Sequence, residues 1–233
     1  MAESRGDSVP QRAHIYRAFD RELAALKRHL REMGELVEAQ IAEAVRALVE
    51  RDPAAAARVI EADRLVNARE LAIDDECIKM IALRQPAGSD LRFIAASLKI
   101  VTDLERIGDL AVNMAERVEA LCSEPPTRAA AALPRMSAAA QRMLRDALEA
   151  FLTQDVAKAE GVLAADADVD RTLVDVFDEL RAEMRRQPGV VDQCVSMMFF
   201  AKHVERLADH ATNLAEMVVF LVRGEDVRHA TRR

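Results

Sequence analysis

The stretch VTDLERIGDLAVNMAERV at residues 101–118 occurs a second time, as AKHVERLADHATNLAEMV at residues 201–218. The matching residues are mostly polar: Glu105, Arg106, Asp109, Asn113, Ala115 and Glu116 recur 100 residues later as Glu205, Arg206, Asp209, Asn213, Ala215 and Glu216. A repeat that only fills a core would match best at apolar positions. The pattern therefore predicts a duplicated structural unit that carries a duplicated polar site.

Outside this stretch, apolar residues recur at intervals of three and four, a pattern typical of amphipathic helices. We expect helices over residues 14–51, 53–84, 89–122, from 129 or 134 to 153, 155–186 and 190–222. The expected N-caps are Asp52, Asp155 and either Ser89 or Asp90, and Gly224 is the expected stop of the last helix. The second helix is expected to bury an apolar stripe made of Val59, Ile60, Val66, Leu71, Ile73, Ile78 and Ile81.

The second half of the chain retraces the first. The Asp-x-x-Val pattern of residues 63–66 returns at residues 166–169, and the Gln-Pro dipeptide of residues 85–86 returns at 187–188. Short connections make neighbouring helices antiparallel. The sequence therefore predicts an all-α fold of two tandem antiparallel three-helix bundles. We place them at residues 14–123 and 127–224, with tails at residues 1–13 and 225–233.

Composition narrows the class of protein. The 233 residues are 51% hydrophobic and 3% aromatic, which favours a helical protein with a sizeable core. The net charge of −7 argues against a nucleic-acid surface, which needs clustered Lys and Arg. Because Cys77, Cys122 and Cys194 are widely spaced, we expect reduced, buried thiols and no zinc site. No apolar run approaches the ~20 residues that span a bilayer, and we expect a cytoplasmic protein.

The shared polar residues form a stripe on each helix. On a helical projection, Asp109 and Asn113 lie within about 80° of Glu105, opposite the apolar residues of the same helix. The stripe is therefore expected to face away from the core. A Glu and an Asp spaced at i and i+4 repel each other, and no basic partner is evident beside them. Two interpretations stay open: a solvated surface, or a site for Mg, Ca, Mn or iron, which suit carboxylate ligands. The second copy places Glu205 and Asp209 in the same arrangement.

A further acidic pair lies on the fifth expected helix. Asp166 and Asp170 are spaced at i and i+4, and their counterparts in the first half are Asp63 and Asn67. We treat Asp63, Asp166 and Asp170 as weaker candidates for metal ligands, because carboxylates near a helix N-terminus also interact favourably with the helix dipole.

Basic residues flank both stripes. Arg106 and Arg206 are candidate counter-ions or phosphate contacts, of which the counter-ion role is favoured. His203 is a candidate ligand, whereas His210 matches Leu110 of the first copy and is expected to pack, half-buried, against its neighbours.

Sequence motifs that mark common catalytic sites are absent from the chain. The chain has no Gly-rich phosphate loop, nucleophile elbow, HExxH or CxxC motif, and no Glu-x-x-His in either stripe. The sequence therefore favours a non-enzymatic protein. Two alternatives remain: a carboxylate-rich helical metalloenzyme or metal-binding protein, and a helical scaffold with solvated acidic faces.

The two copies LERIGDLAVNMAE (104–116) and VERLADHATNLAE (204–216) resemble the paired signatures of the PhoU family of phosphate-uptake regulators. The resemblance covers nearly the whole chain, through the early Phe19 and the segments MGELVE (33–38), DEC (75–77), RQP (84–86), DLR (90–92) and VRGEDVRH (222–229). The duplicated signature and these segments together are far more specific than any one of them.

This resemblance implies two three-helix bundles in a cytoplasmic, usually dimeric protein without catalytic activity. It implies a negative regulator of the phosphate-starvation response that links the ATPase of a phosphate ABC transporter to a sensor histidine kinase, and that meets the membrane only through these partners. Some family members bind metal clusters through E(D)xxxD motifs. These motifs map to Glu105 with Asp109, Glu205 with Asp209, and Asp166 with Asp170, which implies a divalent metal or a multinuclear iron cluster as cofactor.

Overall fold

The computed structural model describes residues 9–123, 125 and 128–224. Within these residues the chain forms α-helices and short 3-10 helices (η) and no strand, which confirms the all-α prediction. The elements are α1 (Val9–Glu50), α2 (Pro53–Arg84), α3 (Gly88–Cys122), η1 (Arg128–Ala132), α4 (Leu133–Thr153), α5 (Val156–Arg186), η2 (Pro188–Val190) and α6 (Val191–Arg223). Helix α1 begins before the expected residue 14, so residues 9–13 are helical. The other residues of the expected tails, 1–8 and 225–233, lie outside the described ranges.

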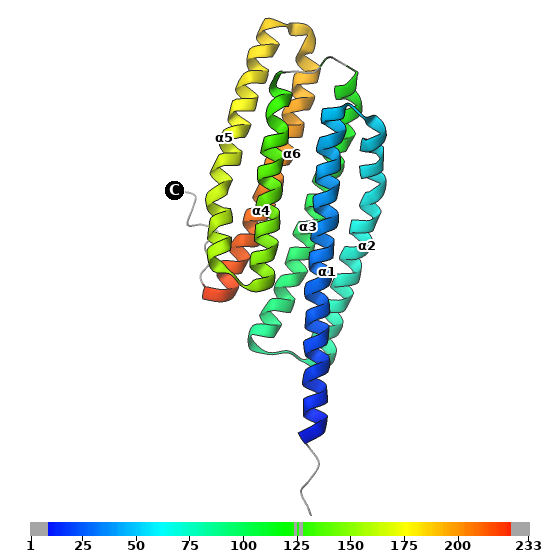
Figure 1. Cartoon of the computed structure of the whole chain (residues 1–233), viewed down its shortest axis with the longest axis vertical. Coiled ribbons are helices and arrows are strands. Elements are labelled where there is room, and N and C mark those ends of the chain that lie inside the picture. Colours follow the sequence, from blue (N-terminus) through cyan, green and yellow to red (C-terminus); the bar gives the residue numbers. More distant parts are fainter. Residues whose placement is uncertain (1–8, 124, 126–127, 225–233) are drawn as a thin grey trace, which may run out of the picture.

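The six long helices run alongside one another as two units, α1 to α3 and α4 to α6 (Figure 1). Helices α2 and α5 lie at opposite edges of the molecule, whereas α3 packs against α6 and α1 packs against α4 in the middle. Each third helix therefore contacts three neighbours: α3 contacts α1, α2 and α6, and α6 contacts α3, α4 and α5. In the described part of the chain, no helix is long and apolar enough to cross a membrane.

Local signals set most helix ends. The Asp52 carboxylate accepts hydrogen bonds from the backbone N–H groups of Ala54 (2.9 Å) and Ala55 (3.1 Å), and Asp155 caps α5 in a similar way. Gly224 ends α6 in the left-handed conformation with φ of 74°, as predicted. The expected cap of α3 is wrong. Helix α3 begins at Gly88, and its N-cap residue Ala87 makes no side-chain capping bond.

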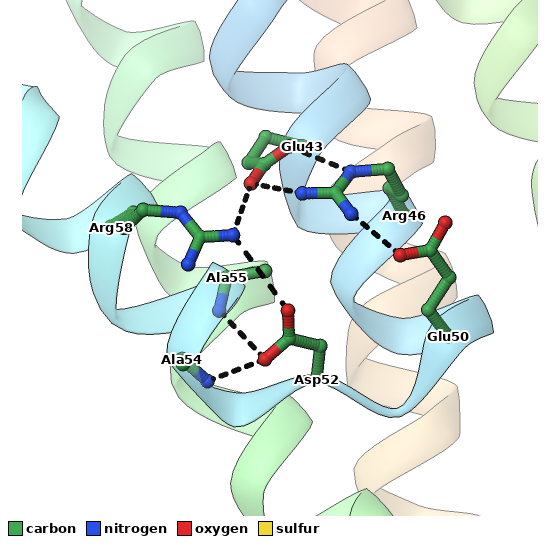
Figure 2. A network of polar contacts seen from close by, with 7 residues as sticks. All are labelled: Glu43, Arg46, Glu50, Asp52, Ala54, Ala55 and Arg58. Carbon is green, nitrogen blue, oxygen red and sulfur yellow. Dashed lines mark hydrogen bonds and ion pairs between the residues drawn. The ribbon is translucent and has the colours of Figure 1, made fainter.

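A network of ion pairs ties the turn between α1 and α2 together (Figure 2). The Glu43 carboxylate accepts hydrogen bonds from Arg46 of the same helix and from Arg58 of α2, the latter at 3.1 Å. Arg58 also lies 3.7 Å from Asp52. Hydrogen bonding to Arg46 is the main reason why the pKa of Glu43 is lowered. The network connects the end of α1 to the start of α2 beside the capping residue.

The predicted apolar stripe of α2 is wrong in part. Val59, Val66 and Ile73 are buried as expected, but Ile60, Leu71 and Ile78 are exposed to solvent. The buried residues of α2 follow a narrow stripe, because α2 lies at an edge of the molecule and packs mainly against α1 and α3. Ile60, Leu71 and Ile78 project from the outer face of the helix, and Ile81 is half-buried.

The capping geometry predicts that Asp52→Ala lowers the Tm by roughly 2–4 °C, because two N–H groups at the start of α2 lose their acceptor. Thermal unfolding followed by circular dichroism measures the change. Asp168→Ala, at an exposed position of α5 that caps no helix, is the control and should stay within about 1–2 °C of the wild type. Equal losses in both variants would show that the cap contributes nothing specific.

Candidate functional site

The acidic stripe of α6 lies against α5 and forms a carboxylate cluster within the second unit. Burial, followed by the charges of Asp170, Asp209 and Glu205, raises the pKa of Asp166 to about 6. Burial also raises the pKa of Glu205, which is only 9% exposed, and the pKa of Asp209. The structure thus brings together all four acids predicted for this half of the chain, and we call them the second cluster.

The first unit holds a corresponding cluster between α2 and α3. Burial raises the pKa of Glu105, and the charges of Asp109, Glu70 and Asp63 add to this effect. Burial likewise raises the pKa of Glu70, with a further contribution from Asp74. The first cluster therefore consists of Glu105 and Asp109 from α3 with Asp63, Glu70 and Asp74 from α2.

Sequence reasoning missed Glu70 and Asp74. Comparison of the two repeats does not reveal them, because the residues 103 positions later are Leu173 and Phe177. The available signal was their spacing from Asp63: residues 63, 67, 70 and 74 follow one face of a helix.

Basic side chains accompany both clusters, among them the predicted counter-ion Arg106 and, beside Glu205, Lys202, which was not predicted from the sequence. Arg106 lies 3.3 Å from Asp109 and 3.6 Å from Glu105, which supports its role as a counter-ion. Lys202 donates a hydrogen bond to Glu205. The charges of Lys202 and Arg206 oppose the effect of burial on the pKa of Asp209. Both clusters are thus partly neutralised by neighbours on their own helix.

The expectation that the stripes face away from the core is also wrong for Glu105 and Glu205. The Glu105 side chain is 18% exposed, because α2 of the first unit covers it. Glu205 is buried, because α5 of the second unit covers it. Asp109 keeps more contact with solvent. Each cluster therefore extends from a covered Glu to a more accessible Asp.

Several polar atoms at the clusters are buried without a hydrogen-bond partner among the described residues. They are Asp63 Oδ1, Asp74 Oδ1, Glu205 Oε2 and both amide atoms of Gln40. Gln40 Oε1 and Asp63 Oδ1 both approach Gly108, where an added Cβ would lie 3.3 and 3.4 Å from them. Unpaired buried polar atoms are rare and costly, so these atoms call for an explanation such as an unseen cation or water.

The carboxylates suit a hard cation by chemistry, because Mg, Ca and Mn prefer oxygen ligands. The placement of these carboxylates around a single point is less complete than their chemistry. Among the described residues, no group of three or more His, Cys, Asp or Glu side chains is placed so as to hold one metal ion. Ligation would need rotations of these side chains toward a common point.

The two histidines occupy different environments at the contact between α3 and α6. His210 Nδ1 lies 2.8 Å from Asp103 Oδ1, so the half-buried His210 pairs with an acid of the other unit. Both ring nitrogens of His203 are buried without a partner among the described residues. Burial, with the charges of Arg117 and Arg206, lowers the pKa of His203. His210 therefore packs half-buried as predicted and joins the two units.

The fold and the clusters define an all-α protein of two tandem units with a carboxylate cluster in each. The model of the PhoU domain matches the chain twice, at residues 30–118 and 133–218, and the chain belongs to the PhoU family. The phosphate-specific transport system accessory protein PhoU homologues of Pseudomonas putida and Pseudomonas aeruginosa are both 41% identical over 217 residues. The matches span 93% of this chain and 85% and 90% of the respective relatives.

Solved structures agree. The crystal structure of PhoU from Pseudomonas aeruginosa has a TM-score of 0.84 and 39% identity, over 89% of this chain and 100% of that one. The phosphate transport system regulatory protein PhoU from Streptococcus pneumoniae has a TM-score of 0.83 and 30% identity, over 90% and 99% of the two chains. The predicted family and fold are confirmed.

The raised pKa of Asp166 has a consequence for stability. The folded state holds the Asp166 proton up to about pH 6, whereas the unfolded state releases it near the ordinary aspartate pKa of 3.8. The folded state thus binds more protons between these values, so stability falls as the pH rises through this window. In protein freed of metal with a chelator, Asp166→Asn should raise the free energy of unfolding at pH 7 by about 1–2 kcal/mol after allowance for solvent screening.

Urea unfolding at pH 4 and pH 7 measures this effect. The gain should be largest at pH 7 and should shrink at pH 4, where Asp166 is protonated in the folded protein. Asp168→Asn, two residues along on the exposed side, is the control. A gain that does not depend on pH would contradict the assigned origin.

Proposed function

We propose that this chain is a non-enzymatic accessory protein of phosphate-specific transport that regulates phosphate uptake. The observation that carries the proposal is its 41% identity, over 93% of its length, to proteins that are named phosphate-specific transport system accessory proteins. The burial of one thiol also argues against its use as a nucleophile. Burial raises the pKa of Cys77 to about 12, so this thiol stays protonated at neutral pH.

The finer form of the proposal is a negative regulator of the phosphate-starvation response. In this role the chain acts in the cytoplasm as a homodimer and links the ATPase of a phosphate ABC transporter to a sensor histidine kinase. It reaches the membrane only through these two partners and keeps the kinase signal off when phosphate is plentiful. Support comes from the duplicated signature, which resembles that of phosphate-uptake regulators, and from the regulatory title of the Streptococcus pneumoniae neighbour.

We propose in addition that both clusters bind divalent cations, with a multinuclear iron cluster as the alternative occupant. Glu105 and Asp109 would be the ligands in the first unit, with Asp63 beside them. Glu205 and Asp209 would act in the second unit with Asp166 and Asp170. A cation would offset the burial and the mutual repulsion that raise the pKa of Asp166 and Glu105, and it would give partners to the unpaired oxygens of Asp63 and Glu205.

Deletion of the gene should derepress alkaline phosphatase in phosphate-rich medium, because the kinase signal is no longer held off. Phosphatase activity in cells grown with and without phosphate measures the effect. A plasmid copy of the wild-type gene is the control and should restore repression. A pull-down from phosphate-replete cells should recover the transporter ATPase or the kinase. Unchanged repression in the deletion strain would count against the regulatory role.

The double variant Glu105→Ala with Asp109→Ala should bind divalent cations at least about tenfold more weakly at the first cluster, with unchanged helix content. Titration calorimetry with Mn²⁺ or Mg²⁺ measures binding, and circular dichroism checks the fold. Asp175→Ala with Glu179→Ala, an exposed acidic pair with the same spacing on α5, is the matched control. Equal binding by both double variants would remove the metal role from Glu105 and Asp109. Oxidase or phosphatase turnover by the metal-loaded protein would favour the metalloenzyme alternative.

A further inference from the structure

The outer face of α2 exposes several large apolar side chains to solvent. On one side of this face lie Ile60, Leu71 and Ile78, which are 43%, 69% and 59% exposed, and on the other side lie Leu65 (53%) and Leu83 (75%). The opposite side of the same helix faces the core. Large apolar side chains that gather on one exposed face mark a candidate interaction surface.

The second unit provides an internal reference, because α5 repeats α2 with a shift of 103 residues. At the positions that match Leu65, Ile78 and Leu83, α5 carries Asp168, Arg181 and Arg186, so the fold does not require apolar side chains there. Ile60 and Leu71 match Leu163 and Val174, which are also apolar; Leu163 packs half-buried against the core and Val174 is 56% exposed. Leu65, Ile78 and Leu83 therefore distinguish the outer face of α2 from that of α5.

The charged residues on this face indicate which molecule. Along α2, the order of charges is Glu61, Arg64, Asp75 and Lys79, all exposed. In a second copy of α2 that runs antiparallel about an axis near residue 70, Arg64 faces Asp75 and Glu61 faces Lys79. Each contact occurs twice because the arrangement is symmetric. The pattern is thus complementary to itself.

The apolar residues fit the same register. About this axis, Ile60 of one copy lies beside Ile78 of the other, and Leu71 lies beside its own counterpart. The midpoints along α2 that the apolar and charged pairs give for the two-fold axis differ by no more than about two residues, or roughly 3 Å along the helix. Helix α5 lacks the complementarity, because Ala164, Ala167 and Ala182 replace Glu61, Arg64 and Lys79.

We propose that two copies of this chain associate through antiparallel packing of their α2 helices over residues 57–82. The inference deepens the homodimer included under the proposed function and names its surface. Apolar contacts at Ile60, Leu71 and Ile78 supply the buried core of the interface, and the two pairs of charges fix orientation and register.

Charge reversal on the full chain tests the register. Arg64→Glu places a Glu against Asp75 of the second copy, and Asp75→Arg places an Arg against Arg64. Each single variant should weaken dimerisation at least about tenfold in sedimentation equilibrium. The double variant with both changes restores opposite charges at the contact and should return the dissociation constant close to that of the wild type. Failure of the double variant to recover would overturn the register.

A second variant tests the surface itself. Leu71→Asp should leave a monomer with unchanged circular dichroism, because Leu71 is exposed within the single chain. Val174→Asp, at the matching and also exposed position of α5, should remain dimeric. A wild-type chain that is monomeric at its highest soluble concentration, or a Leu71→Asp variant that stays dimeric, would overturn the proposal.

Sedimentation measures association alone, so its outcome is separate from that of the phosphatase experiment. A dimer formed through another surface contradicts this inference and leaves the regulatory role intact. An α2 dimer in a chain whose deletion leaves phosphatase repressed would contradict the regulatory role and leave the surface intact.

Discussion

The packing of α3 against α6 is the constraint on which the arrangement of both units depends. Each of these helices already buries one side in its own unit, and their mutual contact buries a second side. The remaining polar side of α3 must then face α2, and that of α6 must face α5. The carboxylates consequently lie in the groove between two helices, where burial raises the pKa of Glu105 and Glu205. A chain selected for stability alone has no reason to place acids there, which is why we regard these clusters as functional.

Local features of the sequence were sufficient to predict most of the secondary structure. Asp52, Asp155 and Gly224 set helix ends through contacts within a few residues, so their effect is visible without knowledge of the fold. The internal repeat made the number of helices predictable, because it too is visible in the sequence without knowledge of the fold. The missing cap of α3 is the exception, because Gly88 extends that helix beyond Ser89 and Asp90.

The surroundings of each helix could not be predicted in the same way. A helical projection divides residues into one buried face and one solvent face, which describes a helix with neighbours on one side only. For α6, with neighbours on several sides, it placed the buried Glu205 in solvent. For α2, at the edge of the molecule, it counted Leu71 and Ile78 as core. Both errors have one physical cause: burial depends on how many helices surround a segment, and periodicity does not report that number.

Divergence between the two copies shows which features belong to the fold and which do not. Hollows of about 350 Å³ between α1 and α2 and about 440 Å³ between α4 and α5 are lined by residues at matching positions, so the packing of the unit is preserved. An acid is kept in both hollows, as Glu43 and Asp146, but the other polar groups differ. Gln40, buried and unpaired beside the first cluster, matches Met143; outside the hollows, Gly108, which gives Gln40 room, matches Ala208.

The two clusters therefore offer a cation different surroundings. The first has Glu70 and Asp74 beyond the shared set, and it has the amide of Gln40 nearby together with an ion-paired Arg106. The second has Asp170 and the charge of Glu216 instead, and its Glu205 is buried and hydrogen-bonded by Lys202. The better access of Glu105 to solvent favours tighter and faster cation binding at the first cluster, because less desolvation opposes it. If both clusters bind cations, duplication has produced two sites of unequal affinity within one chain, and a single scaffold can respond to cations over a wider range of concentration than two identical sites.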